Sequence, residues 1–146
     1  MTDAVKEVLI KASPATIFPY LTDPSKFLQW MGTDAQLVPE PGGEFRVLCG
    51  GDHPSAGTFL EIVPNEKVVF SFGWDLPDHP IPAGSTTVEI TLTPEGDATR
   101  LRLVHRGLPE DAVADHNKGW DYYLTRLETV VHGGDPGPDD PSSQGR

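Results

Sequence analysis

Short stretches of alternating apolar and polar residues fill much of the chain before residue 106. Apolar residues occupy every second position in the runs at 4–12, 44–49, 57–64, 68–74, 87–93 and 100–105. A period of two is typical of β-strands, and a polar opposite face indicates an antiparallel sheet with water on one side. Tight turns are expected at 64–66 and 94–97, where Pro, Asn, Gly or Asp interrupts the alternation. The pattern therefore predicts an antiparallel sheet with one buried face.

Two short helical segments are predicted after the first strand. Ser13 followed by Pro14 is typical of an N-cap with proline at the first helical position, and this segment is expected to reach about Leu21. Pro19 must distort or shorten it, because proline cannot donate a helical hydrogen bond. The second segment starts at Asp23-Pro24 and is expected to end near Trp30.

The last apolar pattern predicts one long helix from about Glu110 to Val131. Its apolar stripe recurs at intervals of three and four residues and comprises Val113, His116, Trp120, Tyr123, Leu124, Leu127, Val130 and Val131. A helix of about 22 residues is about 33 Å long, enough to cross a sheet, and the stripe is expected to face that sheet. Gly133 is a typical helix stop. Gly119 is interpreted as a point of close approach to a neighbouring element.

Residues 133–146 form the only segment whose composition departs from the rest of the chain. Half of these fourteen residues are Gly or Pro, and none is a large apolar residue. Such a segment has no side chain whose burial offsets the entropy of ordering. We therefore predict one domain over residues 1–132 and a disordered, acidic tail over 133–146 that contributes nothing to stability.

Composition and charge narrow the classes of partner. The formal net charge is −11, which repels nucleic-acid phosphates and anionic membrane surfaces, so neither partner is expected. Asp3, Lys6 and Glu7 interrupt the place where a targeting signal would be apolar, and no apolar run is long enough to span a bilayer. The single Cys49 cannot form an intramolecular disulfide. These features favour a cytoplasmic location.

A series of short motifs runs in a fixed order through most of residues 1–132. They are Ala12-Ser13-Pro14, Leu21-Thr22-Asp23-Pro24 with Trp30, Pro41-Gly42-Gly43-Glu44-Phe45, Gly57-Thr58-Phe59-Leu60-Glu61-Ile62, Pro64-Asn65-Glu66-Lys67-Val68, Thr99 to Leu103 with His105, Gly107 and Leu108, and His116-Asn117-Lys118-Gly119-Trp120. Together they resemble the START-like (SRPBCC, birch-pollen-allergen-like) superfamily, and within it the family named for the C-terminal domain of the Hsp90 ATPase activator.

The resemblance implies an α+β helix-grip fold. In that fold a curved antiparallel sheet of six to seven strands surrounds a long C-terminal helix, and two short helices follow the first strand. The superfamily includes lipid binders, cyclases and co-chaperones, so the fold alone does not define an activity.

An aromatic set is expected to converge between the sheet and the long helix. We interpret the following as ligand contacts in a cavity there: Trp30, Phe45, Phe70, Phe72, Trp74, His105, Trp120 and Tyr123. A packed core is the competing interpretation, and it is favoured for Phe70 and Trp120. The face of Phe59 is left open, because alternation pairs it with Glu61. The proline-rich loop 76–84 is either a stiff lid or a rigid connection.

No catalytic residue, metal site or cofactor is predicted. The sequence has no Gly-rich phosphate loop, no Gly-x-Ser-x-Gly and no paired His or Cys ligands. His105 lies on the inner sheet face, where it could orient a polar ligand group or act as an acid–base catalyst. A core histidine bonded to the backbone or a neighbouring loop is the favoured alternative, and His116 is also interpreted as structural. Outward-facing charges are expected to form cross-strand pairs.

Three hypotheses of function follow. The leading one is a protein that binds a small hydrophobic or aromatic ligand between the sheet and the C-terminal helix, with no chemistry of its own. The second is a cyclase- or hydratase-like enzyme that uses His105. The third, implied by the family name alone, is an Hsp90-associated co-chaperone module.

Overall fold

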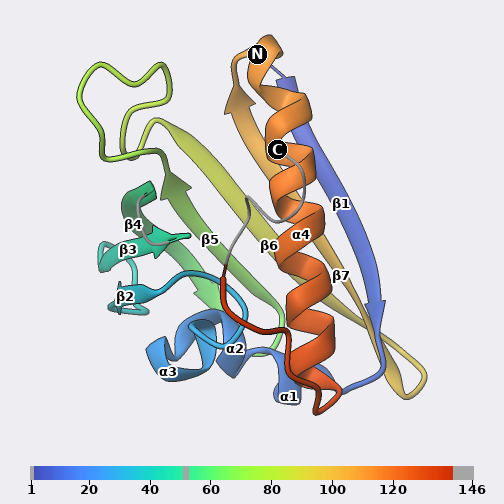
Figure 1. The fold of residues 1–146 in the computed structure, drawn as a ribbon. Coiled ribbons are helices and arrows are strands. Elements are labelled where there is room, and N and C mark those ends of the chain that lie inside the picture. Colours follow the sequence, from blue (N-terminus) through green and yellow to red (C-terminus); the bar gives the residue numbers. More distant parts are fainter. Residues whose placement is uncertain (1, 51–52, 140–146) are drawn as a thin grey trace.

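The computed structural model describes residues 2–50 and 53–139, and these form one antiparallel sheet with helices on its concave side (Figure 1). The order of the sheet is β1-β7-β6-β5-β4-β3-β2. The strands are β1 (Thr2–Ile10), β2 (Asp34–Leu37), β3 (Glu44–Cys49), β4 (His53–Val63), β5 (Lys67–Phe72), β6 (Thr86–Glu95) and β7 (Ala98–Leu108). This architecture confirms the predicted helix-grip fold.

The long C-terminal helix crosses the sheet as predicted. It begins as the 3-10 turn η1 (Glu110–Ala112) and continues as α4 (Val113–Val131). Trp120, Leu124 and Leu127 are at most 4 % exposed, so the apolar stripe faces the sheet. Gly133 ends the helix with φ +87°, and the next amide, that of Gly134, donates to the Thr129 carbonyl oxygen. This is the left-handed stop that glycine adopts without strain.

The segment after β1 contains three short helices rather than two. They are α1 (Pro14–Ile17), α2 (Pro19–Thr22) and α3 (Pro24–Phe27). The Ser13 side chain caps α1 by accepting a hydrogen bond from the Thr16 amide. The predicted first segment is divided at Pro19, because proline has no N–H for the carbonyl oxygen four residues earlier. The second segment ends at Phe27, and turns connect it to Trp30.

The irregular alternation around Phe59 has a local cause. The pairing of β4 with β5 shifts register between Phe59 and Glu61, which indicates a β-bulge. Phe59 is therefore fully buried, while the next two residues, Leu60 and Glu61, are both exposed. A strict period of two cannot predict the face on which Phe59 lies, because the extra residue of the bulge interrupts the alternation after it.

The outer face of the sheet carries the expected cross-strand charge pairs. Glu7 of β1 lies 3.5 Å from both Arg100 and Arg102 of β7, and Lys67 lies 3.2 Å from Glu61. All of these side chains are at least partly exposed, so each pair contributes little to stability. They account for these charges without a catalytic role.

Residues 133–139, which belong to the tail predicted to be disordered, contact the domain, and we name them the C-terminal strap. It runs back from the end of α4 towards β2 and β3 (Figure 1). Arg126 of α4 donates to the carbonyl oxygens of Pro136 and Pro138, at 3.1 and 3.2 Å. Asp139 is only 8 % exposed and accepts hydrogen bonds from four groups of the domain. Polar contacts thus hold a segment that has no large apolar side chain; residues 140–146 lie outside the described part.

Candidate ligand pocket

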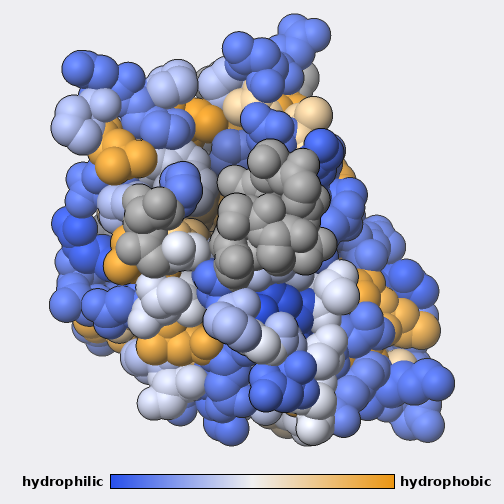
Figure 2. Space-filling view, viewed as in Figure 1, coloured by the Kyte–Doolittle hydropathy of each residue, from blue (hydrophilic) through white to orange (hydrophobic). Residues whose placement is uncertain are grey.

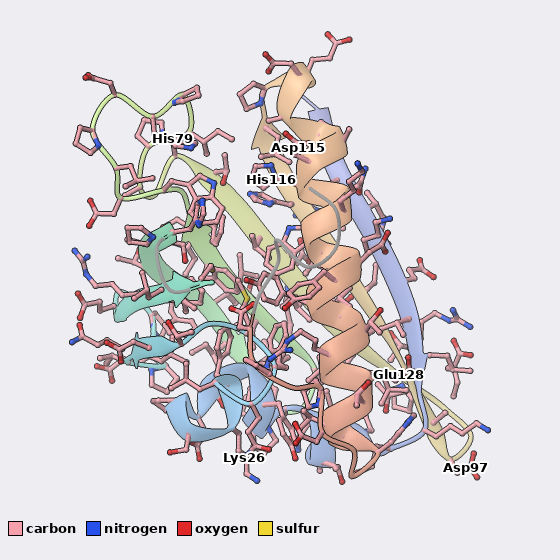
Figure 3. All side chains as sticks on the ribbon, viewed as in Figure 1. Lys26, His79, Asp97, Asp115, His116 and Glu128 are labelled. Atoms are coloured by element: carbon pink, nitrogen blue, oxygen red, sulfur yellow. The ribbon has the colours of Figure 1, made fainter. Side chains whose placement is uncertain are left out.

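A pocket of about 400 Å³ lies between the end of β5, the β5–β6 loop and the N-terminal half of α4. Figure 3 labels His79 in that loop and Asp115 and His116 on α4 across from it. In Figure 2 the surface is notched between the loop and the start of the helix, with hydrophobic residues beside hydrophilic ones. The lining consists of Met31, Cys49, His53, Phe72, Trp74, His79, Pro80, Ile81, Asp111, Ala112, Asp115, His116, Gly119, Trp120 and Tyr123.

The inner part of the pocket is apolar and aromatic. Phe72, Trp120 and Tyr123 are each at most 6 % exposed and belong to the main core. The Phe72 ring lies 5.4 Å from that of Trp74 and 6.0 Å from that of Trp120, in tilted or edge-on arrangements. Trp74 is half-buried, so its ring stands at the boundary between this core and solvent. The floor and one wall therefore offer aromatic surface to a ligand.

The β5–β6 loop folds back onto the strand end that precedes it. The Trp74 amide donates to the Ile81 carbonyl oxygen at 2.8 Å, which closes the loop at its base. Gly73 permits this approach, because a Cβ there would lie 1.7 Å from the Pro82 carbonyl oxygen. Ile81 is buried, whereas Pro80 is exposed at the rim. The loop thus forms one wall of the pocket, the position expected of a lid.

Gly119 does not serve a close approach, and that interpretation is wrong. A Cβ at this position would meet no atom within 4 Å, and the residue lines the pocket. The missing side chain leaves part of the helix face unfilled, directly before Trp120. Gly119 therefore contributes empty volume to the pocket rather than contact with another element.

His105 belongs to a chain of three hydrogen bonds behind the pocket wall, which runs from Trp120 to the Phe72 carbonyl oxygen. Trp120 Nε1 donates to His105 Nδ1 at 3.1 Å, so the ring proton lies on Nε2 and is donated to Thr86 Oγ1 at 2.7 Å. The Thr86 hydroxyl in turn donates to the Phe72 carbonyl oxygen at 2.6 Å. Burial, and to a lesser degree the nearby His116, lowers the pKa of His105 to about 3.

These contacts give His105 a structural role. The side chain is fully buried, both ring nitrogens have partners, and a base of such low pKa does not take up a proton near neutral pH. His105 is not part of the pocket lining. Its bond to the Trp120 indole holds that ring against the pocket, which is how His105 acts on the site.

His116 contacts the pocket rather than the interior alone. Its Nδ1 donates to the Ala112 carbonyl oxygen at 2.9 Å, and its Nε2 accepts a hydrogen bond of 3.4 Å from Trp74 Nε1. The second bond joins α4 to the end of β5 across the pocket. The structural interpretation of His116 is therefore incomplete, because the ring is also part of the lining.

The structure separates the eight predicted contact residues into two groups. Phe72, Trp74, Trp120 and Tyr123 line the pocket, and His105 lies directly behind them. The remaining three are core residues, because each is at most 2 % exposed and none lines the pocket: Trp30, Phe45 and Phe70. Trp30 also donates to the Tyr20 carbonyl oxygen at 2.8 Å. The favoured core role is right for Phe70, and Trp120 is also a core residue that in addition lines the pocket.

Most of the pocket residues that sequence reasoning missed lie on two elements. Asp111 and Ala112 of η1 and Asp115, His116 and Gly119 of α4 share the helix face that also carries Trp120 and Tyr123. Ala112 and Gly119 are small, and this was a sequence signal that the helix face leaves space beside the sheet. His79, Pro80 and Ile81 belong to the loop that was considered as a lid. For Met31, Cys49 and His53 the sequence gives no signal.

Tyr123 connects the pocket to the C-terminal strap. Its hydroxyl donates to Asp139 Oδ2 at 3.0 Å. Burial is the main cause that raises the pKa of Tyr123, and the proximity of Cys49 and Asp139 adds to it. The phenol therefore stays protonated and donates this hydrogen bond throughout the physiological pH range.

Across residues 2–50 and 53–139, no three His, Cys, Asp or Glu side chains come together as metal ligands would. In the same part of the chain, no helix has the length and hydrophobicity that crossing a bilayer requires.

Similarity to known proteins defines the family. The sequence profile described as "Activator of Hsp90 ATPase homolog 1-like protein" matches residues 11–132. The chain belongs to this family. An AHSA1-like protein of Rhizobium etli, RHE_CH02687, is 43 % identical over 94 % of this chain and 86 % of its own, with a TM-score of 0.72. None of the curated proteins matches the sequence.

Less similar proteins share the fold. The Aha1 dimer from Colwellia psychrerythraea is 23 % identical, with a TM-score of 0.79 over 92 % of this chain and 98 % of its own. DynU16, from the dynemicin biosynthetic locus, is also 23 % identical, with a TM-score of 0.79 over 92 % of this chain. The chain spans only 48 % of the length of DynU16. At this identity the likeness concerns the fold alone.

Proposed function

We propose that this AHSA1-like protein binds a small hydrophobic or aromatic molecule in the pocket between the β5–β6 loop and α4. The observation that carries the proposal is the pocket itself, about 400 Å³ in volume and lined by Phe72, Trp74, Trp120 and Tyr123. Pockets that hold small molecules are typically of about 300–1,000 Å³, mostly apolar, with a few polar groups that fix orientation. Here His79 and His116 are such groups.

The arrangement supports binding without chemistry more than an enzyme. The histidine considered as a catalyst, His105, lies behind the wall with both nitrogens bonded and a pKa of about 3. A general acid or base needs a pKa near the working pH and access to the reacting atom. His105 has neither property.

The experiment replaces a lining residue by a larger one, so that its side chain occupies the pocket. In Gly119→Leu the new side chain enters space where a Cβ meets nothing within 4 Å, and leucine also favours the helix. Phenylnaphthylamine, a neutral fluorescent probe of apolar sites, should bind the native protein and lose at least about tenfold in affinity in Gly119→Leu. Ala114→Leu, on the exposed side of the same helix, is the matched control and should bind the probe normally.

Two results would contradict the proposal. One is a native protein that does not bind the probe. The other is a folded Gly119→Leu variant that binds it with unchanged affinity, since the probe would then occupy another site. Circular dichroism of both variants shows whether the helix content is retained.

A second candidate, an Hsp90-associated module, is supported by the family match over residues 11–132. Its test is independent of the pocket: the purified chain is added to Hsp90 of the same organism, and the ATPase rate is measured. A change in rate that Gly119→Leu does not affect would support a role that uses the surface rather than the pocket.

A further inference from the structure

The charged groups around the pocket have one sign. Its lining includes Asp111 and Asp115, whereas none of its residues is a lysine or an arginine, the side chains with a permanent positive charge. Both aspartates are exposed on the first turns of η1 and α4, at the mouth rather than the floor. The pocket therefore combines an aromatic interior with an acidic rim.

These two carboxyl groups are not neutralised by the protein. Among the ion pairs of residues 2–50 and 53–139, neither Asp111 nor Asp115 has a partner. Asp121, further along α4, differs, because Lys6 of β1 lies 2.9 Å from it. The start of the helix supplies about half a positive elementary charge, which the acidic side chains of Glu110, Asp111 and Asp115 outweigh.

Hydrogen bonds fix the orientation of two histidines of the lining. The Ile81 amide donates to His79 Nδ1 at 2.9 Å. At His116 the Trp74 indole donates to Nε2 while Nδ1 donates to the Ala112 carbonyl oxygen. Because the lining contains no lysine or arginine, the two aspartates set the sign of the field at the mouth.

Resting on the proposed function, we propose that the pocket selects aromatic ligands with a basic nitrogen, such as an arylalkylamine, over the corresponding acids. The aromatic body contacts Phe72, Trp74 and Trp120, and the ammonium group lies at the mouth, facing Asp111 and Asp115. Part of the cationic tip can also lie over the half-buried Trp74 ring, since indole faces attract cations. An aromatic carboxylate of the same shape meets repulsion at the same place.

The test uses three probes that share the naphthalene ring system and differ in their polar group: naphthylmethylamine, naphthalenemethanol and naphthoic acid. Affinities are measured by calorimetry at low ionic strength and about pH 8, where free histidine is neutral. The amine should bind about five- to tenfold more tightly than the acid, with the alcohol between them, because each exposed carboxyl group contributes modestly. The advantage should decrease as salt is added.

Two variants assign the effect to the rim. In the double variant Asp111→Asn, Asp115→Asn, the ratio of amine to acid affinity should approach one, while the alcohol binds as before. Asp121→Asn, on the same helix but paired with Lys6, is the matched control and should leave the ratio near the native value.

The outcomes separate the two proposals. If the alcohol binds and Gly119→Leu abolishes its binding, the pocket is a ligand site whatever the charge preference. Equal affinities for amine and acid, or tighter binding of the acid, would then overturn the charge selectivity alone. If none of the three probes binds, both proposals fail.

Discussion

The hydroxyl group of Tyr123 donates a hydrogen bond of 3.0 Å to Oδ2 of Asp139, which joins the middle of α4 to the C-terminal strap. The same oxygen accepts from the amides of Gly32 and Gly50, at 2.8 and 3.0 Å. One carboxyl group therefore connects the helix, the segment before β2 and the turn after β3. Because Tyr123 also lines the pocket, the strap supports one of its walls from behind.

Replacement of Asp139 by alanine should destabilise the protein by roughly 2–4 kcal/mol, because two amides and two tyrosine hydroxyls lose this acceptor. Truncation after His132 should have a similar or larger effect, since it also removes the Arg126 contacts. Urea denaturation measures both. Asp135→Ala, in an exposed part of the strap, is the control and should cost far less. A truncated chain as stable as the full one would show that the strap contributes nothing.

Stability should decrease in acid because of His105. Its folded pKa of about 3 lies below the ordinary 6.5, so between these values the unfolded chain binds a proton that the folded chain does not. Its contribution is therefore fully present above pH 6.5 and is lost as the pH falls towards 3, with a slope of up to about 1.4 kcal/mol per unit. Denaturation curves at a series of pH values measure this slope.

The variant His105→Gln should flatten this part of the pH profile, because glutamine does not titrate. If His105→Gln and the native protein show parallel profiles, another group causes the loss of stability in acid.

Gly119→Ala should stabilise the protein by about 0.5–1 kcal/mol, because glycine in a helix interior costs this much relative to alanine. The new methyl group meets no atom within 4 Å, so no packing penalty opposes the gain. Thermal unfolding should show a higher melting temperature, with probe affinity reduced much less than in Gly119→Leu. A lower melting temperature would show that the helix face at this position is more crowded than the structure indicates.

Trp74 and Phe45 should respond in opposite ways to truncation. Trp74 lines the pocket and is half-buried, so Trp74→Ala should weaken phenylnaphthylamine binding by about 1–3 kcal/mol with a smaller loss of stability. Phe45 is fully buried and stacks on Phe70 at 4.1 Å, so Phe45→Ala should cost about 3–5 kcal/mol of stability. Binding to the folded fraction of Phe45→Ala should change little. If Phe45→Ala weakened probe binding and Trp74→Ala did not, the ligand would bind in the core rather than in the pocket.

Local sequence determined the regular elements of this protein. Six of the seven strands and α4 follow from periods of two and of three to four residues, which depend only on which side of an element faces water. The short strand β2 was not predicted, because no alternating run marks it. The break at Pro19 and the stop at Gly133 follow from the backbone chemistry of single residues. Burial of Trp120, Leu124 and Leu127 could be predicted in the same way, because they lie on one stripe.

Only the tertiary structure decided where space is left unfilled and which distant groups meet. Phe45 and Phe72 have the same alternation and are both buried, yet only Phe72 lines the pocket, which Gly119 of α4 also lines. Composition marked the strap as disordered, although Asp139 reaches the Gly32 amide across 107 residues and is held there. Periodicity reports the polarity of each face, whereas cavities and long-range hydrogen bonds depend on how separate elements fit together.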